Sequence, residues 1–210
     1  MAQTGQREPR TQEQRSGSTR SLILDAAVEC LVAEGYERTT TVTVQARAGV
    51  SRGRLLHHFP SRAALLVAAA HHLADSRIQE MERWIAEWSP GSPSGAARVD
   101  RATELLWSTF TQPYFWAAME LWTAARTDDD LRQQLVPAER RIGRGVRHVI
   151  DTMYGPEHSS HPDFPQLREL LFTSMRGVAL SYAIQPRDPR TDPRLLFWRK
   201  LARDTLLPRF

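Results

Sequence analysis

Residues 39–62 constrain the fold of this chain more than any other segment. They read TTTVTVQARAGVSRGRLLHHFPSR, with Gly49 between two short stretches of helical apolar spacing. Thr40 and Ser51 are good N-caps, so we predict one helix over residues 41–47 and a second that begins after Ser51. Two short helices joined by a tight turn that contains glycine indicate a helix-turn-helix, whose second helix enters the major groove of DNA.

The charge of the same region is strongly asymmetric. No acidic residue lies between Glu37 and Asp75. The basic side chains of this stretch are Arg38, Arg47, Arg52, Arg54 and Arg62, with His57, His58, His71 and His72. The formal net charge of the whole chain is only +4, and most of it lies in the first third. A local excess of positive charge of this kind favours a polyanionic partner.

Composition excludes several classes of protein. The only cysteine is Cys30, which rules out an intramolecular disulfide framework and fits a reducing cytoplasm. No apolar run approaches the roughly 20 residues that span a bilayer, and the polar N-terminus has no signal core. We therefore expect a soluble, cytoplasmic protein that is not bound to a membrane, with 41% hydrophobic residues to build its core.

Apolar periodicity predicts helices throughout and no strand, so the predicted fold class is all-α. The first helix covers residues 21–35 and is capped by Gly35. In the helix after Ser51, Leu55 and Phe59 share the buried face, which directs Arg52, Arg54 and His57 outward. The remaining predicted helices are 61–88, 97–111, 113–127, 129–154, 164–185 and 192–207. Residues 1–18 form a disordered basic tail, either inert or ordered on DNA; residues 19–64 form the DNA-binding head, and 65–210 the body.

The segment AGVSRGRLLHHFPSRAALL, behind an amphipathic helix and a Thr-rich helix start, resembles the TetR family of one-component bacterial transcription regulators. The motif-level likeness covers about residues 19–70; beyond them only the all-α architecture is similar. The resemblance implies a three-helix head, a body for ligand binding and dimerisation, and a repressor that a small effector releases from DNA.

Arg52 and Arg54 lie in the first turns of the third helix, where arginine can donate two hydrogen bonds to guanine. The open alternative is that they only neutralise phosphates. Gly53 suits a close approach of the backbone. The resemblance assigns phosphate contacts to Thr40, Thr41, His58 and Arg62, and Leu56 stands where tyrosine is usual. The predicted DNA-binding residues are Thr40, Thr41, Ser51, Arg52, Gly53, Arg54, Leu56, His57, His58 and Arg62.

Aromatic and methionine side chains gather in the body and suit an apolar pocket for an unknown small-molecule effector. The predicted lining residues are Trp107, Phe110, Phe115, Trp116, Met119, Trp122, Met153, Phe172 and Met175. For each of them the alternative is an ordinary place in the core. Glu120 and Arg126 are either polar anchors for the effector or residues that face solvent or pair with another helix.

The last two helices, 164–185 and 192–207, have broad apolar surfaces. The resemblance implies a homodimer through this pair, with two recognition helices about 34–36 Å apart on a palindromic operator. Adjacent histidines such as His71 and His72 cannot chelate one ion together, so we predict no metal site. The sequence has no paired carboxylates, glycine-rich phosphate loop or Ser-His-Asp arrangement with recognisable spacing, so we predict no enzymatic activity, and we expect no cofactor. A sequence-tolerant DNA-coating protein and an all-α ligand-carrying module or enzyme remain the alternatives.

Overall fold

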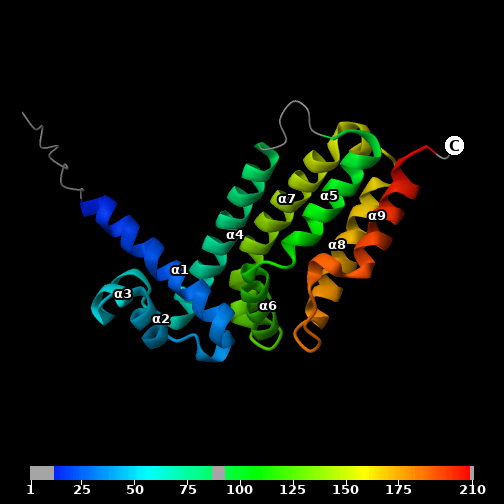
Figure 1. The fold of residues 1–210 in the computed structure, drawn as a ribbon. Helices are drawn as coiled ribbons and strands as arrows, with labels where there is room; N and C mark the ends of the chain where they lie inside the picture. Colours follow the sequence, from blue (N-terminus) through cyan, green and yellow to red (C-terminus); the bar gives the residue numbers. More distant parts are fainter. Residues whose placement is uncertain (1–11, 87–92, 209–210) are drawn as a thin grey trace, which may run out of the picture. The chain divides into compact units, whose positions relative to one another are not determined.

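The structure is a computed structural model that describes residues 12–86 and 93–208. Those residues form nine α-helices, one 3-10 helix and no strand, which confirms the all-α prediction (Figure 1). The elements are α1 (Gln12–Arg38), α2 (Thr41–Ala48), α3 (Arg52–His58), α4 (Arg62–Ala86), α5 (Gly95–Thr109), α6 (Pro113–Ala125), α7 (Asp129–Ser159), α8 (Phe164–Ser181), η1 (Pro189–Thr191) and α9 (Pro193–Leu206).

The chain packs into two compact units. Of the described residues, the first unit contains 12–72 and 117–135, and the second contains 73–86, 93–116 and 136–208. The boundaries between the units fall inside α4, α6 and α7, so three helices contribute to both. These units group residues by how they pack. The predicted boundary after residue 64 instead separates the DNA-binding head from the body, and it stays a prediction.

The core of the first unit brings together the first four helices. Its buried side chains are Ile23, Leu24, Ala26, Ala27, Cys30, Val44, Leu55, Phe59, Leu65 and Ala69. Both apolar residues predicted to hold α3 in place, Leu55 and Phe59, are buried. Buried side chains on one face of α2 and of α3 therefore anchor these short helices to the core, and the opposite faces of both helices remain in solvent.

Helix α1 differs from its prediction at both ends. It begins at Gln12 rather than at residue 21, so residues 12–18 are helical and not the disordered tail that was predicted; residues 1–11 lie outside the described part. At the other end Gly35 does not terminate the helix. It adopts φ 78° and ψ 176°, which bends the chain, and helical structure resumes as far as Arg38. This region of backbone space is open essentially to glycine alone.

In the second unit α9 packs against α5 and α8 (Figure 1). Helix α7 runs to Ser159, beyond its predicted end at residue 154, because a bend at Gly155 (φ 79°) is followed by further helix. Arg98 closes this bend: its Nε and Nη2 donate to the carbonyl oxygens of Met153 and Thr152, each at 2.9 Å. Helix α8 ends at Ser181, before the predicted residue 185.

Candidate nucleic-acid interface and effector site

A reciprocal pair of hydrogen bonds fixes the start of α2. The backbone N–H of Thr43 donates to Thr40 Oγ1 at 3.1 Å, and the N–H of Thr40 donates to Thr43 Oγ1 at 2.8 Å. This capping box satisfies two donors that a helix start otherwise leaves open. Thr40 therefore orients α2 through its side chain, while Thr41, at the first helical position, is partly exposed.

Helix α3 presents its basic residues to solvent. Ser51 caps it, with the Arg54 N–H donating to Ser51 Oγ at 3.3 Å. Arg52, Arg54, Leu56 and His57 are exposed, as the helical spacing predicts. Within the described part of the chain, the guanidinium groups of Arg52 and Arg54 have no hydrogen-bond or ion-pair partner. These two cations are available to an anion from outside the unit.

Gly53 lies between these two arginines, and the fold does not require glycine there. A Cβ atom built at Gly53 would meet no heavy atom within 4 Å. Glycine inside a helix nevertheless costs about 1 kcal/mol relative to alanine. The missing side chain leaves the backbone of α3 open on the same exposed side as the basic residues.

His58 follows on the last turn of α3 and is partly buried. Burial lowers its pKa below the ordinary value, and the nearby charges of His57, Arg20 and Arg54 lower it further. At neutral pH the ring is therefore neutral. A neutral imidazole can donate one hydrogen bond to a phosphate without forming an ion pair.

Arg62 has a different environment from the one that the phosphate prediction assumes. Its Nε donates to the Thr39 carbonyl oxygen at 2.8 Å, and its Nη2 donates to the Tyr36 carbonyl oxygen at 2.5 Å. The guanidinium also stacks over the Tyr36 ring at 4.2 Å. Arg62 therefore joins the start of α4 to residues 36–39, which form the end of α1 and the beginning of its connection to α2, and its observed contacts are structural.

Glu120 of α6 contacts the same segment. Its Oε2 accepts a hydrogen bond from the Tyr36 backbone N–H at 2.7 Å, and it lies 3.1 Å from the position of a Cβ on Gly35. Of the roles predicted for Glu120, the interhelical one describes this contact. Tyr36 is thus bonded through its N–H to α6 and through its carbonyl to α4. Sequence reasoning missed this junction, for which the bend at Gly35 is the only local signal.

Four of the predicted effector residues form one aromatic cluster in the second unit. Phe110 meets Phe115 edge to face at 5.7 Å between ring centroids and meets Phe172 at 5.2 Å. Trp116 lies 5.2 Å from Phe115. The structure therefore brings α5, α6 and α8 together through aromatic side chains, as an apolar lining would require.

The other predicted lining residues are placed differently. Met153 and Met175 are fully buried in the core of the second unit. Met119 and Trp122 belong to the packing of the first unit, and the Trp122 side chain is exposed. Trp107 turns toward α9, with its centroid 4.9 Å from that of Trp198.

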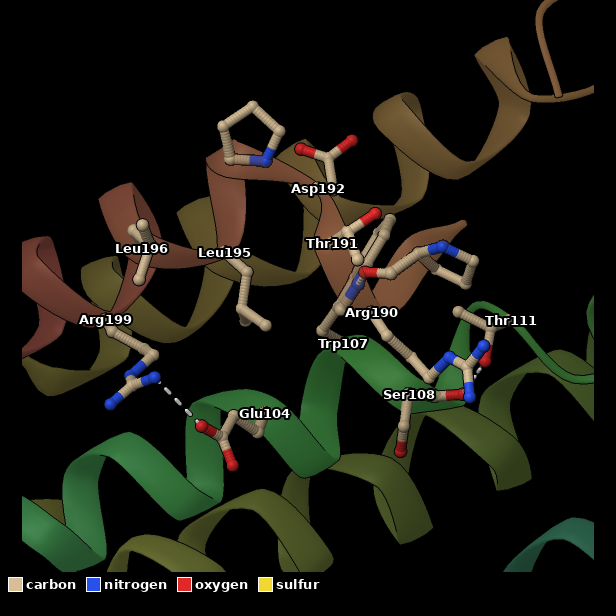
Figure 2. Close-up of a pocket in the computed structure, with 12 residues that line it drawn as sticks. Glu104, Trp107, Ser108, Thr111, Arg190, Thr191, Asp192, Leu195, Leu196 and Arg199 are labelled. Carbon is tan, nitrogen blue, oxygen red and sulfur yellow. Dashed lines mark hydrogen bonds and ion pairs between the residues drawn. The ribbon is translucent and has the colours of Figure 1, made fainter. Parts of the chain in front are cut away.

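Trp107 lines a pocket of about 570 Å³ between α5 and the segment that leads from η1 into α9. Figure 2 shows Leu195 and Leu196 of α9 among the lining residues, with the ion pair of Glu104 and Arg199 at one end of the pocket. The indole Nε1 donates to the Pro189 carbonyl oxygen at 2.7 Å. Trp107 is the one predicted effector residue that lines this pocket.

Helices α8 and α9 also carry apolar side chains that the second unit does not cover. Leu196 and Phe197 are 67% and 63% exposed. The other exposed apolar residues of these helices and of the turn that follows α8 are Leu170, Leu180 and Ile184. Isolated exposed leucines are ordinary, and a contiguous group of them is what marks an interaction surface.

In the part of the chain that the structure describes, no group of three or more His, Cys, Asp or Glu side chains is placed to hold a metal ion. No helix in residues 12–86 and 93–208 has the length and apolar character needed to cross a membrane.

Residues 23–69, which contain α2, α3 and the start of α4, match the family model described as bacterial regulatory proteins, tetR family. The HTH-type transcriptional regulator CymR from Pseudomonas putida is 30% identical over 174 residues, which are 81% of this chain and 82% of that protein. The chain belongs to the TetR family of bacterial, DNA-binding transcription regulators.

Solved structures show a similar fold over almost the whole chain. A putative TetR-family regulator from Rhodococcus sp. superposes with a TM-score of 0.62 at 20% identity, over 90% of this chain and 98% of the other. FadR from Bacillus subtilis, solved with stearoyl-CoA, superposes with a TM-score of 0.57 at 18% identity, over 88% and 96% of the two chains.

Proposed function

We propose that this protein is a repressor that binds a palindromic operator as a homodimer and is released by a small, mostly apolar effector. The observation that carries the proposal is the exposed face of α3. Arg52 and Arg54 extend from a helix whose other face is anchored by buried Leu55 and Phe59. A rigid helix with unpaired arginines in its first turns has the form of a recognition helix.

We assign the recognition of bases to Arg52 and Arg54. Their neighbours are assigned contacts that fix the position of α3 on the DNA. A guanidinium can donate two parallel hydrogen bonds to guanine O6 and N7, which discriminates between bases. Gly53 allows the backbone between them to approach the groove, and Leu56 offers an apolar contact to a thymine methyl group. Thr41, His57 and the neutral ring of His58 suit phosphates. Thr40, Ser51 and Arg62 act by holding the helices in position.

Dimerisation is assigned to α8 and α9. The exposed Leu170, Leu180, Leu196 and Phe197 support this assignment, since an isologous interface needs an apolar patch that each copy presents to the other. Gly177 of α8 adds support, because a Cβ there would meet nothing within 4 Å and a partner helix could approach closely. A two-fold dimer would place two copies of α3 about one DNA turn apart.

Effector control is proposed to act through helices that belong to both units. Small-molecule response is typical of the family, and the structurally similar FadR binds stearoyl-CoA. Displacement of α4 or α6 would act directly on Tyr36, which both helices hold by hydrogen bonds. An effector that binds one arrangement of these helices more tightly than the other would shift the population away from the DNA-binding form.

Selection of binding sites from random and genomic duplexes tests the proposal. The purified full chain should enrich one palindrome whose half-sites are about one DNA turn apart. Uniform binding to all duplexes with a steep salt dependence would instead identify a DNA-coating protein. The absence of any binding would exclude both and leave a ligand-carrying module.

A further inference from the structure

Arg77 of α4 is a buried charge in the second unit. Only 10% of its side chain is exposed, and its guanidinium stacks over the ring of Tyr114 at 4.0 Å. Its Nη1 lies 3.3 Å from Oε2 of Glu80, one turn further along the same helix. Burial lowers the pKa of Arg77 to about 10, against the raising influence of Glu80. Burying a guanidinium is costly, and the ion pair with Glu80 and the stacking on Tyr114 offset part of that cost.

Tyr114 supplies a second, independent observation. Its hydroxyl oxygen is buried and has no hydrogen-bond partner in the described part of the chain. Buried hydroxyl groups in proteins are nearly always satisfied, because an unmade hydrogen bond costs free energy. The buried hydroxyl of Tyr154, in contrast, has a hydrogen-bond partner, because it lies 2.8 Å from Thr103 Oγ1.

The two observations concern one place, since the guanidinium stacks on the ring that carries the unpartnered hydroxyl. The O–H group can donate to an acceptor, and the adjacent guanidinium favours negative charge on that acceptor. Phe115 and Trp116, which follow Tyr114 on α6, belong to the aromatic cluster with Phe110 and Phe172. The cluster thus begins at the residue next to Tyr114, although consecutive side chains of a helix point about 100° apart.

We propose that Tyr114 and Arg77 form the polar end of the effector site and bind the carboxylate of an otherwise apolar effector. Tyr114 Oη donates to a carboxylate oxygen, and Arg77 provides the positive charge beside it. The apolar part of the effector lies toward the aromatic cluster. This inference rests on the proposed effector-responsive function and adds the chemical class of the ligand.

Binding of matched acids and amides to the full chain without DNA tests the inference. The probes are decanoate and 3-phenylpropionate, each with its primary amide, and the readout is isothermal titration calorimetry. At least one acid should bind about tenfold or more tightly than its amide, as expected for a charge-assisted hydrogen bond. Equal affinities, or no binding of either acid at millimolar concentration, would overturn the inference.

Two variants assign this preference to the named residues. Tyr114→Phe should weaken acid binding severalfold without lowering the unfolding temperature, because it removes a hydroxyl that has no partner. Tyr154→Phe is its control and should lower that temperature, since it breaks the contact with Thr103. Arg77→Gln should abolish the preference for acid over amide. Its control is Arg101→Gln, which removes an exposed arginine 3.7 Å from Glu104 in the same i, i+3 geometry.

Retention of acid preference in Arg77→Gln, or a loss of stability in Tyr114→Phe, would contradict the assignment. Failure of this inference is separable from failure of the proposed function. Selection of a palindrome without acid binding would refute only the carboxylate site. Acid binding without a selected palindrome would refute the operator-binding function and leave the site in place.

Discussion

At the scale of single residues, the two glycines Gly35 and Gly53 are retained for different reasons. Gly35 has a positive φ, and a Cβ on it would lie 3.1 Å from Glu120 Oε2. Gly53 lies in a regular helix with open space around it. The fold needs the first glycine, whereas the second would serve the close approach of α3 to DNA that we propose.

Alanine substitution should separate these reasons. Gly35→Ala should lower the free energy of unfolding by about 1–3 kcal/mol, because alanine is strained in that backbone region. Gly53→Ala should raise it by about 0.5–1 kcal/mol and yet weaken operator binding. Chemical denaturation and DNA titration measure the two effects. Unchanged stability in Gly35→Ala, or undiminished operator binding in Gly53→Ala, would contradict these explanations.

At the scale of helices, Arg62 determines how α4 is attached to residues 36–39, at the end of α1 and the beginning of its connection to α2. Arg62→Met keeps the aliphatic stem but removes both hydrogen bonds to backbone carbonyls and the stacking on Tyr36. The free energy of unfolding should fall by about 1–3 kcal/mol, since two buried carbonyl groups lose a charged donor. Arg38→Met, at an exposed position, is the matched control. A variant of unchanged stability that loses only salt-dependent DNA affinity would restore the phosphate role for Arg62.

The sequence predicted the helices well where their ends are encoded locally. Thr40, Ser51 and Gly49 set the limits of α2 and α3 through capping that involves only near neighbours, and the structure contains those caps. The exposed face of α3 followed from the spacing of Leu55 and Phe59. The prediction that Gly35 ends the first helix was wrong, because a glycine is equally expected at a helix cap and at a bend within a helix.

Contacts between distant residues lay beyond prediction. The hydrogen bond from Tyr36 to Glu120 spans 84 positions, and nothing in the spacing of either residue specifies it. Arg62 was matched to a phosphate position by its motif, although its guanidinium reaches backbone carbonyls 23 and 26 positions earlier. The sequence identified the aromatic residues of the body but could not divide them into pocket-lining and core residues, because both groups have the same apolar periodicity.

At the scale of the whole molecule, operator recognition is expected to depend on a dimer formed through α8 and α9. The double substitution Leu196→Glu with Phe197→Glu places charge on the exposed apolar surface, so it should yield a monomer whose operator affinity falls by orders of magnitude. Light scattering coupled to size-exclusion chromatography measures the mass. Leu22→Glu on α1, also an exposed leucine, should remain dimeric. A dimeric double variant would show that another surface joins the two copies.

The central claim is that Arg52 and Arg54 read the operator. Its most direct test compares the affinity of the Arg52→Ala, Arg54→Ala double variant for the selected palindrome and for a scrambled duplex at one salt concentration. Arg140→Ala with Arg144→Ala, two exposed arginines of α7, controls for the loss of charge. We predict that the α3 variant remains dimeric and binds both duplexes equally, while the α7 variant keeps the wild-type preference. A sequence preference retained by the α3 variant would contradict the claim.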